Sequence, residues 1–132
     1  MKSKSPKILV VDDDPHFRNA VISILETHGY RVAEEPSALS VIRAINKEKP
    51  DLILLDLKMP KAGGMEVIKT MRRMSIYIPV VVVSGHLSQQ NFHNLRVLGV
   101  EYFLVKPINL RMLVAKVKEA IELKAAHHGD GI

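Results

Sequence analysis

Hydrophobic residues are arranged along this chain in two alternating patterns. Short continuous apolar runs alternate with longer segments in which apolar residues recur every three or four positions. The runs are typical of strands buried on both faces of a parallel sheet, and the periodic segments of amphipathic helices. One run, residues 52–55, lies between Pro50 and Pro60 and leads directly to a single carboxylate, Asp56. We therefore predict a buried strand that carries Asp56 at its carboxyl end.

The same patterns continue through the chain and predict five strands that alternate with five helices. Parallel neighbours need helical crossovers, so the fold class is α/β with a doubly wound parallel sheet. The expected strands are residues 7–11, 30–35, 52–56, 78–83 and 101–105. The expected helices are residues 15–28, 38–49, 65–74, 87–98 and 109–121.

Length and composition suit one domain. The chain has 132 residues, of which 47% are hydrophobic, and this is enough for one sizeable core. We expect an N-terminal tail at 1–6, the domain at 7–124, and a disordered tail or the start of a linker at 125–132. Cysteine is absent, the Lys-rich start does not read as a signal peptide, and no apolar run approaches the length of a membrane span. A cytoplasmic protein without a membrane partner is the expectation.

The charge balance raises the question of nucleic acid. Nineteen basic and fourteen acidic residues give a formal net charge of +5, and a basic chain can bind phosphate backbones. The basic residues are spread over the N-terminal tail, the middle of the chain and the C-terminal segment, with few aromatic residues among them. We interpret them as solvated helix faces and expect no direct contact with nucleic acid.

Polar side chains follow four of the five predicted strands. Asp12 and Asp13 follow the first, Asp56 ends the third, Ser84 follows the fourth and Lys106 the fifth. Each has an ordinary structural explanation as a cap, turn or solvated residue, and the next acid along the chain, Asp14, is best explained as a helix N-cap. In a parallel sheet, however, all four strand ends lie at one edge, where the sites of such folds collect. We therefore predict one site there.

The chemistry of this set follows from its charges. Three converging carboxylates repel one another unless a cation neutralises them, and an all-oxygen ligand set favours a hard ion, Mg²⁺ or Mn²⁺. A carboxylate beside such an ion can act as a nucleophile toward a phosphoryl group, with a lysine and a hydroxyl contacting the transferred oxygens. The sequence contains no G-x-x-x-x-G-K-[ST], so a P-loop nucleotide site is excluded.

The span from about Lys7 to Leu123 resembles a receiver domain of the response regulators of two-component signal transduction. The resemblance is carried, in order, by VVDDDP, LLDLKMP, VVVSG and LVKP. It implies a flavodoxin-like sheet with strand order 2-1-3-4-5, and it makes Asp56 the phosphoacceptor. It also implies that Asp13 binds Mg²⁺ directly, that Asp12 acts through water, and that the backbone carbonyl of Lys58 completes the protein ligands.

The resemblance also assigns the switch. Ser84 matches the hydroxyl that swings toward the phosphoryl group, and Lys106 matches the lysine that contacts it, before a peptide bond to Pro107 that is often cis. The switch aromatic is Phe103 where Tyr is more usual, and the adjacent Tyr102 is expected on the opposite face of the strand. A second departure is Gly63, where the family often has Asp.

Two positions beside the site, Lys58 and His86, match variable positions that tune loss of the phosphoryl group in the family. One hypothesis is that their long polar side chains hinder the attacking water and prolong the phosphorylated state. The alternative is that both side chains simply point into solvent.

The function expected from the resemblance is that of a phospho-accepting switch. A histidine kinase or phosphotransfer protein donates to Asp56, and the altered face binds a downstream effector, a fused output domain or a second copy of the chain; that face includes Met112, Ala115, Lys116 and Glu119. Such a domain catalyses only its own phosphorylation and dephosphorylation. The alternatives are a phosphorylation-independent interaction module and, third, a hydrolase with an aspartyl-phosphate intermediate, whose second acid position is occupied here by Lys58.

Overall fold

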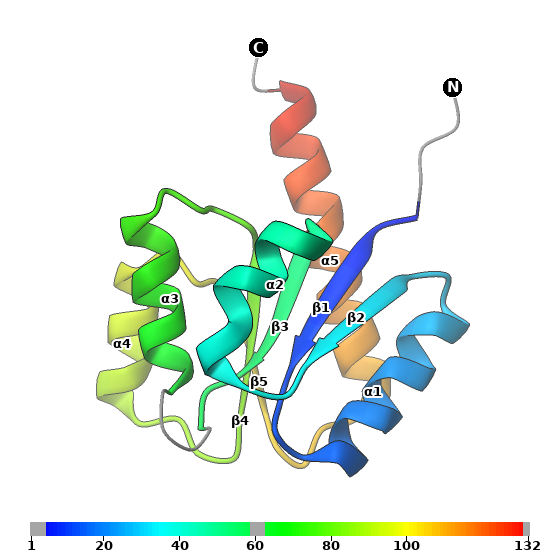
Figure 1. Cartoon of the computed structure of the whole chain (residues 1–132), viewed down its shortest axis with the longest axis horizontal. Coiled ribbons are helices and arrows are strands. Elements are labelled where there is room, and N and C mark those ends of the chain that lie inside the picture. Colours follow the sequence, from blue (N-terminus) through cyan, green and yellow to red (C-terminus); the bar gives the residue numbers. More distant parts are fainter. Residues whose placement is uncertain (1–4, 59–62, 131–132) are drawn as a thin grey trace.

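The computed structural model describes residues 5–58 and 63–130. Within these ranges five parallel strands lie in the order β2-β1-β3-β4-β5, between two layers of helices (Figure 1). The strands are β1 (Lys7–Val11), β2 (Arg31–Glu35), β3 (Leu52–Asp56), β4 (Val80–Ser84) and β5 (Tyr102–Val105). The helices are α1 (Pro15–Thr27), α2 (Val41–Glu48), α3 (Gly64–Arg73), α4 (Gln89–Val97) and α5 (Leu110–Asp130), with a short 3₁₀ helix at Ala38–Ser40. The predicted fold class and strand order are confirmed.

Alternate residues of the strands form two separate hydrophobic cores. Leu9 and Val11 of β1 belong to the core beneath α2, α3 and α4, whereas Ile8 and Val10 belong to the core beneath α1 and α5. Successive side chains of a strand point to opposite faces of the sheet, so a run that is apolar at every position is buried on both faces. This explains the unbroken runs in the sequence.

Two element boundaries fix the edge of the sheet where the strands end. Asp14 caps α1, accepting hydrogen bonds from the backbone N–H groups of His16 and Phe17, as predicted. Gly64 begins α3 directly against the end of β3. A Cβ atom at Gly64 would lie 2.7 Å from the carbonyl oxygen of Asp56, so only glycine allows this close approach.

Some details differ from the sequence predictions. In α3, Val67 is buried and Met65 only partly so, and the helix begins one residue earlier than expected. In α4, only Leu95 of the expected apolar face is fully buried. The backbone is helical as far as Asp130, whereas the sequence suggested a disordered tail or the start of a linker from residue 125; the domain boundaries stay a prediction. None of the described helices is both long and apolar enough to cross a membrane.

Candidate functional site

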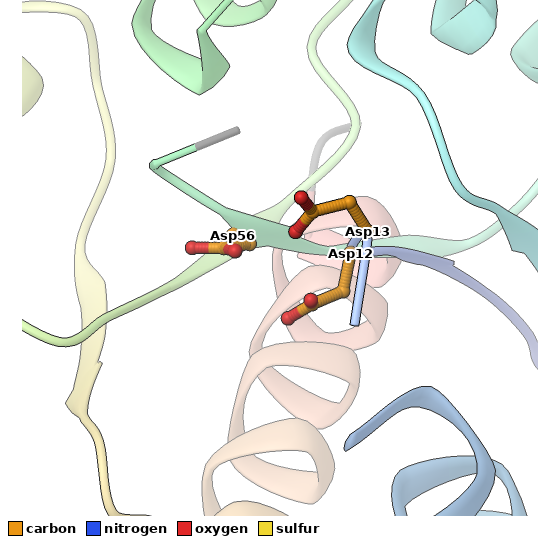
Figure 2. A group of neighbouring side chains, drawn as sticks. All are labelled: Asp12, Asp13 and Asp56. Carbon is orange, nitrogen blue, oxygen red and sulfur yellow. The ribbon is translucent and has the colours of Figure 1, made fainter. Parts of the chain in front are cut away.

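Three carboxylates converge at the carboxyl edge of the sheet. Asp12 and Asp13 follow β1, Asp56 ends the adjacent β3, and one oxygen from each lies within 4.8 Å of the others (Figure 2). Asp12 and Asp56 are only 1% and 5% exposed, whereas Asp13 is exposed. The convergence predicted from the strand ends is therefore present in the structure.

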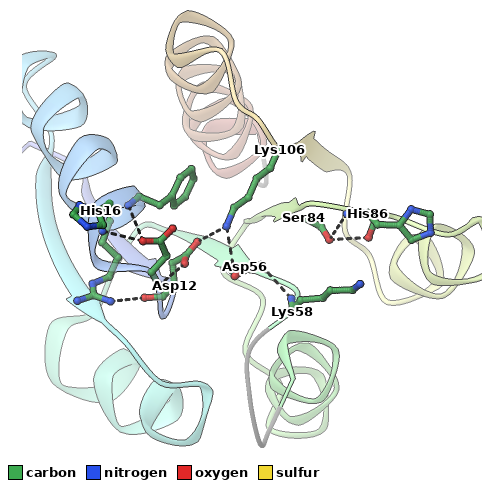
Figure 3. Close-up of polar contacts among 10 residues, drawn as sticks. Asp12, His16, Asp56, Lys58, Ser84, His86 and Lys106 are labelled. Carbon is green, nitrogen blue, oxygen red and sulfur yellow. Dashed lines mark hydrogen bonds and ion pairs between the residues drawn. The ribbon is translucent and has the colours of Figure 1, made fainter.

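Lys106, which follows the edge strand β5, also reaches this cluster. Its Nζ lies 3.1 Å from Oδ2 of Asp12 and 3.6 Å from Oδ2 of Asp56 (Figure 3). The peptide bond from Lys106 to Pro107 is cis, as the resemblance implied. Burial by itself would lower the pKa of Lys106, but the hydrogen bond and charge of Asp12, with the charge of Asp56, raise it overall. The ammonium group therefore remains charged.

The pKa of Asp56 is raised above its ordinary value, first by burial and then by the charge of Asp12. Two contacts oppose this increase: the backbone N–H of Lys58 donates to Oδ1 of Asp56 at 3.1 Å, and Lys106 lies beside Oδ2. One ammonium group cannot balance three carboxylates. A hard divalent cation fits the excess negative charge and the all-oxygen donors, and Asp12, Asp13 and Asp56 are the residues that would hold it. The carbonyl of Lys58 as a further ligand stays a prediction.

The resemblance assigns two residues, Ser84 and Phe103, to the switch. Ser84 is 1% exposed, and its Oγ donates to the carbonyl of His86 at 2.8 Å and accepts from the N–H of His86 at 3.3 Å (Figure 3). Phe103 packs on the α4 side of the sheet, where its ring centroid lies 4.7 Å from that of Phe92. Tyr102 belongs to the opposite core, so the predicted opposition of the two aromatic residues is confirmed.

Lys58 and His86, the two positions proposed to tune loss of the phosphoryl group, are both exposed. Exposure is compatible with either interpretation given above, because a solvated side chain beside the site can still obstruct an approaching water molecule. Their effect on the lifetime of a phosphorylated state stays a prediction.

Sequence reasoning missed three neighbours of the site. The ring centroid of Phe17 lies 4.3 Å from Nζ of Lys106. Arg18 donates from Nη1 to the carbonyl of Asp12 at 2.8 Å and pairs through Nε with Glu34 at 3.0 Å. The ring of Phe92 contacts that of Phe103, and the two ring planes are tilted by 44°. The available signal was the position of Phe17 and Arg18 in the first turn of the helix that follows the acid pair.

Comparison with known proteins finds relatives that match most of this chain. The family model of the response regulator receiver domain matches residues 8–118. Among curated relatives, the transcriptional regulatory protein PrrA of Mycobacterium bovis is 34% identical over 126 residues, which cover 92% of this chain and 52% of that protein. Sporulation initiation phosphotransferase F of Bacillus subtilis is 29% identical over 119 residues, which cover 90% of this chain and 96% of that protein.

Solved structures show the same likeness. A CheY-like response regulator receiver domain protein from Methanospirillum hungatei superimposes with a TM-score of 0.88 at 29% identity, covering 95% of this chain and 99% of that chain. The chain spans about half the length of PrrA and nearly all of the Bacillus phosphotransferase. Since the family model covers most of the chain and the structure has the matching topology, this protein belongs to the family of response regulator receiver domains.

Proposed function

We propose that this chain is a phosphoacceptor whose nucleophile is Asp56. The observation that carries the proposal is the position of this buried carboxylate between two further acids and the ammonium group of Lys106. A carboxylate oxygen of Asp56 attacks the phosphorus of a phosphohistidine on a histidine kinase or phosphotransfer protein. The P–N bond breaks, its electron pair leaves with the imidazole nitrogen, and that nitrogen takes up a proton.

Each neighbour of Asp56 has a role in this reaction. The N–H of Lys58 orients the carboxylate by holding Oδ1, and Lys106, 3.6 Å from Oδ2, is placed to contact an oxygen of the arriving phosphoryl group. A bound Mg²⁺ or Mn²⁺ ion would supply neutralisation of the negative charge on the acids and on the transferred group. Asp12, Asp13, Asp56 and the carbonyl of Lys58 are the proposed ligands.

Phosphorylation would then act on the switch. A phosphoryl group adds a charge of about −2, which attracts the Ser84 hydroxyl away from the carbonyl of His86, and Phe103 follows. The added charge biases two existing states of α4, β5 and α5. The face that responds includes the exposed Met112 and Ala115 of α5, together with Lys116 and Glu119. We assign to it a downstream protein effector, an output domain fused to this domain, or a second copy of the chain.

This function places the protein in the cytoplasm, with no reaction other than its own phosphorylation and dephosphorylation. Family membership supports the cytoplasmic location. Lys58 argues against a hydrolase, because a hydrolase that uses an aspartyl phosphate would carry a second acid at this position. The spread of basic residues supports a protein partner rather than nucleic acid.

The test is incubation with acetyl phosphate and Mg²⁺, followed by intact-protein mass spectrometry. Wild type is expected to gain one phosphoryl group, and Asp56→Asn none. Asp51→Asn serves as the matched control, because Asp51 lies just before the same strand and accepts a hydrogen bond from the backbone of Lys7 instead; this variant should be labelled like wild type. Failure of the wild type to take up a phosphoryl group would favour the phosphorylation-independent interaction module.

A further inference from the structure

We propose that Phe17 is a positioning residue that holds the ammonium group of Lys106 at the acid cluster. The proposal rests on the proposed function, in which Lys106 contacts the phosphoryl group that arrives at Asp56. Phe17 carries no group that reacts. It acts through Lys106, and its aromatic ring, rather than its bulk, is the feature required.

The contacts of Lys106 define the arrangement. Its Nζ lies 3.1 Å from Asp12, 3.6 Å from Asp56 and 4.3 Å from the centroid of the Phe17 ring. A lysine side chain is a flexible stem that ends in a point charge, so carboxylates alone leave it free to move between them. The negative face of an aromatic ring attracts a cation within about 6 Å. The ring therefore adds a third contact to the two ion pairs.

The ring is itself held in place by the turn that presents the acids. Asp14 caps α1 and accepts from the backbone N–H of Phe17 at 3.4 Å, so the ring belongs to the first turn after the acid pair. Phe17 is partly buried and packs against the core formed by α1, α5 and the sheet. The Lys106 side chain is 26% exposed, and a cation–π contact gains strength as water is excluded from it.

The Phe17 ring is expected to hold Lys106 in place even when the charge of Asp12 is neutralised. The attraction between Lys106 and Asp12 depends on the negative charge of Asp12, and a cation held by the acid cluster would weaken it. The attraction between Lys106 and the Phe17 ring does not depend on that charge. We therefore expect the share of Phe17 in fixing Lys106 to be larger under the conditions in which the reaction runs.

The experiment compares Phe17→Leu with Phe17→Tyr. Leucine keeps an apolar side chain but removes the ring, whereas tyrosine keeps the ring. The limiting rate of labelling by acetyl phosphate and Mg²⁺ is expected to fall about 3- to 20-fold in Phe17→Leu, the range of a partly desolvated cation–π contact, and to stay near the wild-type rate in Phe17→Tyr. Ile24→Val, a change of packing on the same helix and core, is the matched control and should leave the rate unchanged.

A double-mutant cycle separates positioning from a merely structural role. In a Lys106→Ala background, followed over long incubations, Phe17→Leu should cause no further loss, because the group through which Phe17 acts is gone. An equal loss in both backgrounds would overturn the proposal. A full rate in Phe17→Leu would overturn it as well.

A second measurement makes failure of this proposal distinct from failure of the proposed function. In NMR spectra of the unphosphorylated protein, the ring of Phe17 should shift the Hε resonances of Lys106 upfield, and Phe17→Leu should remove that shift while Phe17→Tyr keeps it. Absence of the shift in wild type would overturn the proposal whatever the outcome of labelling. A wild type that shows the shift but takes up no phosphoryl group would instead contradict the function assigned to Asp56.

Discussion

Replacement of Asp56 by asparagine is expected to stabilise the fold while it abolishes labelling. Asparagine has nearly the same shape and keeps an oxygen that can accept the hydrogen bond from the backbone N–H of Lys58. What it removes is a buried negative charge beside Asp12 and Asp13. In the absence of metal, the substitution therefore relieves a repulsion that exists only in the folded state.

The distances give the size of the effect. With an effective dielectric constant of about 20, a separation of 4.8 Å or less corresponds to a repulsion of at least about 3.5 kcal/mol between Asp56 and Asp12. Asp13 adds a smaller repulsion because it is exposed, and the attraction of Lys106 at 3.6 Å, about 4.5 kcal/mol, opposes both. Burial of the charge tips the balance toward the neutral side chain. We expect the free energy of unfolding to rise by about 1 to 3 kcal/mol.

The direction of the pH dependence follows from the same charges. The folded state raises the pKa of Asp56 above its ordinary value of 3.8, so the folded protein binds more protons than the unfolded chain in the window just above that value. The contribution of Asp56 to stability is therefore lost as the pH rises through its folded-state pKa. The advantage of Asp56→Asn should appear across this window, persist at neutral pH and shrink in acid.

The assay is urea denaturation followed by circular dichroism, with EDTA and then with millimolar Mg²⁺. Ions that bind only the folded state raise its stability according to concentration and affinity, so Mg²⁺ should stabilise wild type more than Asp56→Asn and narrow the difference. Asp51→Asn is the control and should not stabilise the protein. An Asp56→Asn variant that is less stable than wild type in EDTA at neutral pH would refute the argument that the acids repel one another in the fold.

Three further predictions concern the surroundings of the site. Arg18→Leu should weaken Mg²⁺ binding about 5- to 10-fold in calorimetric titration, because the loop that carries the acid pair loses a charged hydrogen-bond donor. Phe92→Ala removes the ring that packs on Phe103, so phosphorylation should shift the amide resonances of α4 much less, although labelling proceeds at the wild-type rate. Lys58→Ala and His86→Ala should each shorten the lifetime of the phosphorylated protein, measured by its loss of mass over time.

Each of these predictions has a clear contrary result. Arg31→Leu removes a surface arginine whose Nε donates to the carbonyl of Ser5, so it is the matched control for Arg18→Leu. Equal Mg²⁺ affinity in the two variants would contradict a role for the hydrogen bond from Arg18 to the carbonyl of Asp12. Undiminished α4 shifts in Phe92→Ala would show that the ring contact does not carry the switch. Unchanged lifetimes in Lys58→Ala and His86→Ala would leave the solvated interpretation of those side chains.

The order of the elements and the location of the acid cluster could be predicted from the amino-acid sequence alone. Buried parallel strands need apolar residues at every position, and a helix start needs a capping residue such as Asp14, so both can be recognised in a short stretch of sequence. Once the strands are parallel, their carboxyl ends share one edge. Asp12, Asp13 and Asp56 could therefore be brought together from the sequence pattern.

The pairing of the side chains at that edge depends on how the elements are arranged in three dimensions. The ion pair of Lys106 with Asp12, the ring of Phe17 beside the ammonium group and the contact between Phe92 and Phe103 join residues from different elements. Likewise, the Ser84 hydroxyl donates to the carbonyl of His86 in only one of the several rotamers that a serine side chain can adopt. Long side chains choose among such states through packing and charge from neighbours distant in the chain. Contacts with such neighbours cannot be predicted from local sequence patterns.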